Sequence, residues 1–139
     1  QLTLSQKIPV SGSVIVTTPQ DIALLDAKKG LAMFEKGNIP ILGIVENMSL
    51  HICSNCGHEE AIFGVGGGEQ MAKDANVNFL GALPLEMEIR TDVDEGVPTV
   101  AKDPEGRVAE IYKEIARKVS AKLTQQDKAL GAFPSITIE

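Results

Sequence analysis

Apolar residues of this chain fall into short solid runs, separated by longer segments in which they recur every three or four positions. The solid runs cover residues 13–18, 39–45 and 79–83, and such runs are typical of strands buried on both faces of a sheet. The wider spacing predicts helices over 18–37, 69–75 and 103–123. Strands that alternate with helices in this way predict an α/β fold, a parallel sheet with helices on both faces.

The first long helix carries suitable residues at both ends. Thr18 is predicted to be its N-cap, Pro19 its first residue, and Asp21 a favourable charge near the positive end of the helix dipole. Gly37 and Asn38 are predicted to end it.

The chain is expected to be one domain over residues 1–123, with a cysteine loop near 49–63 and a C-terminal tail over 124–139 in which 136–138 could add a strand to a sheet. Parallel sheets are normally wider than three strands, so part of this sheet is expected to lie outside the chain. The acidic positions over 86–95 are interpreted as a solvated helix face.

Polar or special residues follow the ends of the predicted strands, where open parallel sheets bind their ligands. Asn47 follows the second strand and Pro84 follows the third. Each is an ordinary turn residue by itself, and their common place at neighbouring strand ends makes them candidates for a binding site.

The cysteine loop grows from the middle strand and holds the only two cysteines, Cys53 and Cys56. A redox pair is disfavoured, because the polar surroundings predict a loop instead of a helix N-terminus. A zinc site could recruit His51 or His58, although ligands so close in sequence crowd one ion. A third possibility is a site shared across a two-fold axis, where two thiolates from each chain hold a [4Fe-4S] cluster or Zn²⁺.

The glycine cluster over 64–68 lacks the Lys-Ser/Thr of a phosphate-binding loop and does not follow a strand. It is interpreted as a flexible hinge that then begins a helix.

Composition narrows the function classes. The chain has 139 residues and a net charge of −6 without a basic stripe, which argues against nucleic-acid binding. No apolar run is long enough for a membrane span and no signal peptide is recognised. Two closely spaced thiols suit a reducing cytosol, so a cytoplasmic location is expected. Because residue 1 is Gln, the chain is expected to be a piece of a longer protein.

Five blocks occur in order along the chain: VTTPQDIALLDA (16–27), GIVENMS (43–49), CSNC (53–56), FGVGGG (63–68) and LGALPL (80–85). In this order they closely resemble the C-terminal part of the Mrp/ApbC family of iron–sulfur cluster carrier ATPases, relatives of MinD and the nitrogenase iron protein. The match covers about residues 1–123. The resemblance implies a partial P-loop NTPase, Rossmann-like fold.

The resemblance also implies a function. Members of the family are homodimeric or heterodimeric ATPases that bind a transferable [4Fe-4S] cluster between protomers and deliver it to apo iron–sulfur proteins. Cys53 and Cys56 would be its ligands in this chain, and Asn47 and the Pro84 region would contact the adenine of ATP.

The chain departs from the family in one respect. It contains neither the Walker A loop with its lysines nor the acidic switch that binds Mg²⁺. It therefore resembles a C-terminal fragment, and we expect it alone neither to hydrolyse ATP nor to bind it tightly. The runner-up function is a stand-alone zinc-binding interaction module without catalysis. A MinD-like positioning ATPase is disfavoured, because no basic amphipathic membrane anchor ends the chain.

Overall fold

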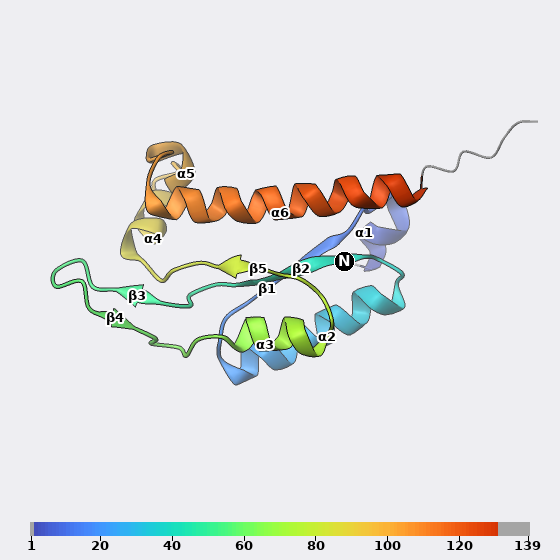
Figure 1. Cartoon of the computed structure of the whole chain (residues 1–139), viewed down its shortest axis with the longest axis horizontal. Coiled ribbons are helices and arrows are strands. Elements are labelled where there is room, and N and C mark those ends of the chain that lie inside the picture. Colours follow the sequence, from blue (N-terminus) through green and yellow to red (C-terminus); the bar gives the residue numbers. More distant parts are fainter. Residues whose placement is uncertain (1, 131–139) are drawn as a thin grey trace, which may run out of the picture.

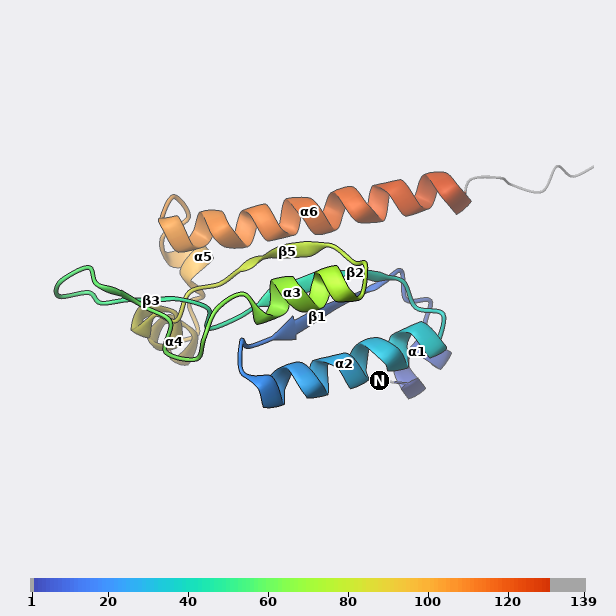
Figure 2. The same ribbon diagram turned by 60° about the horizontal axis from the view of Figure 1, so that its bottom comes forward.

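A three-stranded parallel sheet runs through the middle of the molecule in the order β1-β2-β5 (Figure 1). Its strands are β1 (Ser13–Thr17), β2 (Ile41–Glu46) and β5 (Phe79–Ala82). This computed structural model describes residues 2–130. Helices α2 (Asp21–Lys36) and α3 (Gly67–Asp74) lie on one side of the sheet, and α6 (Arg107–Leu130) lies on the other (Figures 1 and 2). The predicted α/β architecture is confirmed.

Each face of the sheet has its own hydrophobic cluster, because successive residues of a strand point to opposite faces. Ile44 of β2 is fully buried on the side of α2 and α3, where it packs with Ile15, Leu31, Met71 and Ala72. On the other face, the apolar stripe of α6 packs against Val45 of β2, Leu80 of β5 and Leu83, which follows β5. These two clusters hold the helices on the central strand.

The first strand differs from its prediction, because only one of its faces is buried. Ile15 and Thr17 are buried, whereas 36% of Val14 and 60% of Val16 is exposed. β1 is one of the two edge strands of the described sheet, and α6 packs on β2 and β5. The β-branched run therefore predicted the strand correctly. The prediction that both faces of this strand are buried was wrong.

Two elements also begin at residues other than those predicted. Helix α2 begins at Asp21 with Gln20 as its N-cap, and the hydroxyl of Thr18 donates to Gln20 Oε1 (2.6 Å) instead of capping the helix. Strand β2 begins at Ile41, after Pro40, which has no N–H to donate to a neighbouring strand.

Short elements complete the described part of the chain. They are α1 (Leu2–Lys7), the hairpin strands β3 (His51–Ile52) and β4 (Glu59–Glu60), α4 (Met87–Asp94) and α5 (Thr99–Lys102). Helix α6 begins at Arg107, later than the predicted start at 103, and runs through 124–130, which were expected to belong to the tail. The rest of that tail, including the strand expected at 136–138, lies outside the described residues.

The acidic stretch 86–95 was predicted to be solvated, and Asp92 contradicts this prediction. Asp92 is only 1% exposed. Its carboxylate accepts hydrogen bonds from Thr99 Oγ1 (2.7 Å) and Lys102 Nζ (2.6 Å). The bond from Lys102 is the main reason that the pKa of Asp92 is lowered. Asp92 thereby joins α4 to α5.

Candidate metal site and nucleotide edge

The carboxyl ends of the three strands meet at one edge of the sheet. Thr17 aligns with Glu46 in the pairing of β1 with β2, and Glu46 aligns with Ala82 in the pairing of β2 with β5. Hydrogen bonds continue beyond the strands, from Asn47 N–H to Thr17 O (2.7 Å) and from Leu83 N–H to Glu46 O (2.8 Å). The predicted convergence of the strand ends is therefore present.

Strands β3 and β4 form an antiparallel hairpin that projects from this edge (Figure 1). At its tip, Cys53 N–H donates to His58 O (2.9 Å) and Gly57 N–H donates to Cys53 O (2.8 Å). Gly57 has φ of +71°, a left-handed conformation that glycine adopts readily. The tip is thus a closed turn that contains both cysteines.

Both thiols are free, with Cys53 half-buried and Cys56 exposed. The backbone N–H of Cys56, and then that of Asn55, lower the pKa of the Cys53 thiol by stabilising its thiolate. A thiolate is the form that binds metal. The turn therefore presents Cys53 in a form suited to ligation.

The two histidines do not complete a metal site with the cysteines. His51 Nδ1 lies 2.8 Å from Leu85 O, a contact that fixes the imidazole against the segment after β5. His58 is exposed. Within residues 2–130, no three His, Cys, Asp or Glu side chains are gathered so that they could hold a metal ion. A zinc shell within one chain is thus not assembled among these residues.

Glu46 is a buried residue that the sequence reasoning missed. The residue is 1% exposed, and its carboxylate accepts hydrogen bonds from Ser49 Oγ (2.6 Å), Gly66 N–H (3.0 Å) and Gly68 N–H (2.7 Å). The glycine cluster, interpreted as a hinge, is therefore bound to a carboxylate of the same chain. A Glu that ends an apolar strand was the available signal in the sequence.

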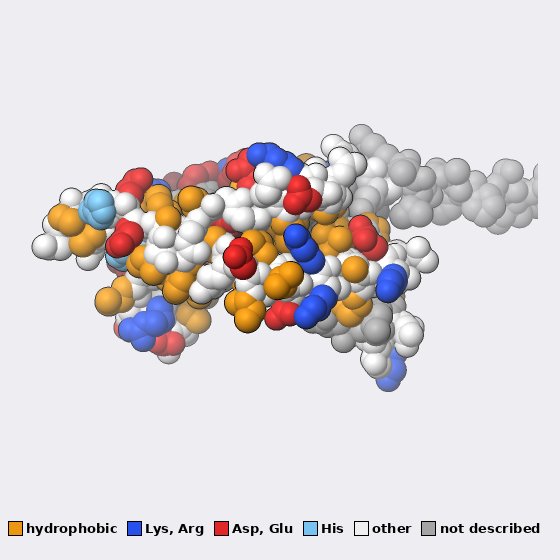
Figure 3. Space-filling view, turned by 90° about the horizontal axis from the view of Figure 1, so that it is seen from below, with side chains coloured by type: hydrophobic (Ala, Val, Ile, Leu, Met, Phe, Trp, Pro, Cys, Tyr) orange, Lys and Arg blue, Asp and Glu red, His pale blue; other side chains and the backbone are white. Residues whose placement is uncertain are grey.

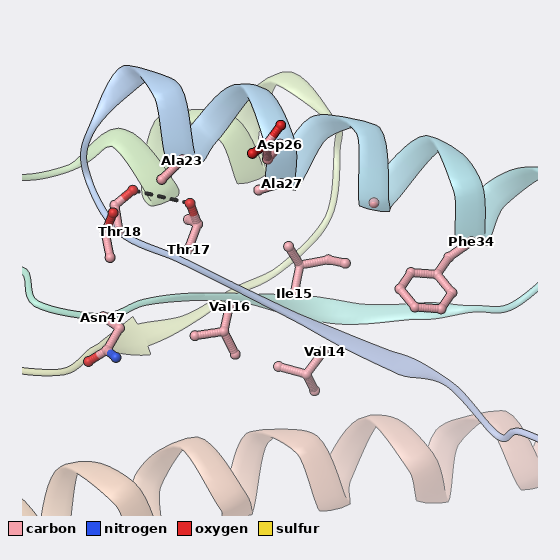
Figure 4. A pocket seen from close by; sticks show the side chains of 11 residues that line it. Val14, Ile15, Val16, Thr17, Thr18, Ala23, Asp26, Ala27, Phe34 and Asn47 are labelled. Atoms are coloured by element: carbon pink, nitrogen blue, oxygen red, sulfur yellow. Dashed lines mark hydrogen bonds between the residues drawn. The ribbon is translucent and has the colours of Figure 1, made fainter. Parts of the chain in front are cut away.

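Asn47 lies at the end of a groove of about 560 Å³ between β1 and α2. Figure 4 shows it near Thr17 and Thr18, with Ile15 and Phe34 farther along the groove. The Asn47 side chain accepts a hydrogen bond from Met48 N–H (2.9 Å). Pro84 is buried and is not among the described residues that line this groove. The two candidates thus share the strand-end region, and only Asn47 reaches the groove.

Apolar side chains lie on the surface between the hairpin and the two helices below the sheet (Figure 3). The exposed apolar residues of these segments are Ile22, Leu25, Ile62, Phe63 and Val65. Exposed apolar residues therefore follow the hairpin, between β4 and α3.

Comparison with protein families places the chain among known proteins. The family model described as ParA, NUBPL iron-transfer P-loop NTPase, matches residues 1–120. An iron–sulfur cluster carrier protein of Haemophilus influenzae is 58% identical over 94% of the chain, and the match covers 35% of that relative. The mouse iron–sulfur cluster transfer protein NUBPL is 47% identical over 88% of the chain and is covered to 39%. The chain thus spans little more than a third of the length of these relatives.

Solved structures agree on the fold. The cell division ATPase MinD of Pyrococcus furiosus matches 80% of the chain with a TM-score of 0.63 at 23% identity, and 43% of it is covered. A nucleotide-binding protein of Archaeoglobus fulgidus in complex with ADP matches 76% of the chain with a TM-score of 0.62 at 31% identity, with 42% of it covered. None of the helices that the structure describes is long and apolar enough to cross a membrane. The family match over residues 1–120 shows that the chain belongs to the ParA family of NUBPL iron-transfer P-loop NTPases.

Proposed function

We propose that this chain is the cysteine-bearing part of an ATP-dependent carrier that holds a transferable [4Fe-4S] cluster between two chains and delivers it to apo iron–sulfur proteins. The observation that carries the proposal is the hairpin tip, where two free thiols lie without a third ligand among the described residues. Four thiolates are the usual ligand set of such a cluster, so a second protomer, identical or paralogous, would supply the other two. The relatives named as cluster carriers support the same function.

The position of the thiols suits a cargo that must be released. Cys56 is exposed and Cys53 is half-buried, so thiolates of a recipient protein can approach the iron atoms that these residues bind. Each incoming thiolate would replace one outgoing thiolate, which leaves the number of ligands on iron unchanged. A buried site would hold the cluster more firmly and exclude the recipient.

The nucleotide would bind at the carboxyl edge of the sheet, where Asn47 lines the groove beside β1. In the proposed site Asn47 contacts the adenine, and the segment that contains Pro84 supports the neighbouring strand end. The phosphates and Mg²⁺ require the Walker A loop with its lysine and the acidic switch motif, and neither motif occurs in these 139 residues. ATP hydrolysis is accordingly proposed for the longer protein, in a reducing compartment such as the cytoplasm.

Anaerobic reconstitution with ferrous iron and sulfide tests the proposal. The chain is expected to acquire a brown chromophore with bound iron and sulfide, and both Cys53→Ser and Cys56→Ser are expected to lose it. Ser54→Ala, which alters the same turn without removing a thiol, is the matched control and should keep the chromophore. Circular dichroism should show the same secondary structure in all four proteins, because the tip lies outside both hydrophobic clusters.

The zinc module makes a different prediction. If the chain binds no iron or sulfide and instead binds one colourless Zn²⁺ as a monomer, the result would contradict the carrier function. It would support the zinc-binding module. Full uptake of iron and sulfide by Cys53→Ser would show that the ligands are misassigned.

A further inference from the structure

The cysteine hairpin has an outgoing arm, residues 49–52, and a returning arm, residues 59–66. Among the described residues, Glu46 alone has a side chain that is hydrogen-bonded to both arms. Its Oε1 accepts from Ser49 Oγ on the outgoing arm and from Gly66 N–H on the returning arm. Its Oε2 accepts from Gly68 N–H at the start of α3. We propose that Glu46 is a positioning residue that fixes the direction of the hairpin, and with it the two thiols, relative to the ends of the strands. The functional part of this inference rests on the proposed function above.

The two arms have few other fixed points near their base. On the outgoing arm, Ser49 N–H donates to Leu83 O (3.0 Å) and Leu50 O accepts from Leu85 N–H (2.9 Å). On the returning arm, residues 61–65 are exposed and cross the surface before α3 begins. The carboxylate of Glu46 is therefore the point at which the returning arm is bonded back to the sheet.

The chemistry of the contact suits a carboxylate. Gly66 is the N-cap of α3 and Gly68 lies in its first turn, where unpaired N–H groups and the helix dipole favour an anion. Ser49 supplies a third donor, so the buried charge is well bonded. Hydrogen bonds to a charged acceptor are stronger than those between neutral groups.

The close contact also favours glycine at position 68. A Cβ there would lie 3.0 Å from Glu46 Cβ and 3.3 Å from its Oε2, closer than most real contacts. The glycine cluster thus has a specific role in this chain, since it lets the start of α3 approach the carboxylate closely.

Glu46 connects the hairpin to the candidate nucleotide edge through the backbone. Its carbonyl accepts from Leu83 N–H, and the next residue, Asn47, donates to Thr17 O. One residue thus bonds to the hairpin through its side chain and to the neighbouring strand end through its backbone. A shift of this strand end would therefore change the position of the hairpin, and with it the two thiols, through Glu46.

The test replaces Glu46 with Gln, which keeps the shape and loses one acceptor and the charge. The matched control is Glu60→Gln, an exposed carboxylate on the returning arm that removes the same charge. By hydrogen exchange, amides of residues 51–66 are expected to exchange about tenfold faster in Glu46→Gln, a change that corresponds to about 1.4 kcal/mol in the free energy of local opening. Amides of β1, β2 and β5 should keep their wild-type rates.

The cluster provides a second readout. After anaerobic reconstitution, Glu46→Gln is expected to lose iron to a chelator several-fold faster than Glu60→Gln and to show an altered visible circular dichroism spectrum. Exchange and release rates equal to those of Glu60→Gln would overturn the proposal. Should Glu46→Gln fail to fold, Ser49→Ala removes a single donor, and faster exchange confined to the outgoing arm would support the proposal, whereas unchanged exchange would overturn it.

The two proposals can fail separately. A wild-type chain that binds no cluster, combined with faster hairpin exchange in Glu46→Gln, would contradict the carrier function and leave the positioning role supported. A wild-type chain that binds the cluster, combined with unchanged exchange and release in Glu46→Gln, would contradict the positioning role alone.

Discussion

At the scale of single residues, the cysteine turn combines accessibility with a stabilised thiolate. The N–H groups of Cys56 and Asn55 lower the pKa of the Cys53 thiol, while Cys53 remains half-exposed. These N–H groups are held in place by the bonds that close the turn, so the effect depends on the folded hairpin. Unfolding should remove it.

Alkylation of Cys53 is therefore expected to be faster in the folded chain than in urea at pH values below the ordinary thiol pKa. A lowered pKa means that a larger fraction of Cys53 is thiolate at a given pH. The measurement is the pH profile of iodoacetamide alkylation in the Cys56→Ser variant, which keeps the backbone N–H at position 56. A folded profile whose midpoint equals or exceeds that of the unfolded chain would contradict this prediction.

The sequence predicted some of these residues and missed others for a physical reason. The cysteine pair is visible because its two members are close in the chain. A Glu at the end of an apolar strand was a local signal for Glu46, but its glycine partners lie 20 and 22 residues away, so no local pattern identifies its contacts. Asp92 was missed similarly, since its partners on α5 reach it only after the chain turns back.

At the scale of elements, β1 has one strand neighbour in the described sheet and an apolar outer face. Edge strands with unpaired backbone groups and apolar side chains pair readily with other chains. In the chain of 139 residues, this edge is expected to bring two copies together without metal.

Val16→Lys should weaken this association, because a lysine on an edge strand opposes pairing. The measurement is sedimentation velocity in the presence of a chelator, where the variant is expected to shift toward monomer. Val93→Lys is the matched control. Val93 lies on α4, away from the sheet edge, and its exposed fraction of 61% is close to the 60% of Val16. Equal association of the two variants would show that β1 is not the contact.

Elements were predictable where one local signal dominated. The three strands and the long C-terminal helix follow from apolar spacing, and β5 occupies Phe79–Ala82 within its predicted run. The short helices α1 and α5 carry too few residues for a period to show. The outer face of β1 was mispredicted because a β-branched run does not reveal whether a helix covers it.

At the scale of the whole molecule, the 139 residues contain the strand-end edge proposed to bind adenine and lack the Walker A and acidic switch motifs that bind phosphate and Mg²⁺. The glycine cluster binds the carboxylate of Glu46, so its amides at positions 66 and 68 are already bonded. Most of the attraction for ATP in P-loop proteins comes from the loop amides, lysine and Mg²⁺.

We therefore expect the isolated chain to bind ATP no more tightly than millimolar and to release no phosphate from it. Isothermal titration calorimetry with MgATP and a phosphate-release assay measure both quantities. Micromolar affinity would mean that the nucleotide site is complete within these residues.

The shared cluster is the central claim, and native mass spectrometry of the anaerobically reconstituted chain tests it most directly. Two thiols per chain and four thiolate ligands per cluster predict a species of two chains with one [4Fe-4S] cluster, absent in Cys53→Ser. A single chain that carries the metal by itself, with no two-chain species that depends on the cluster, would contradict the account.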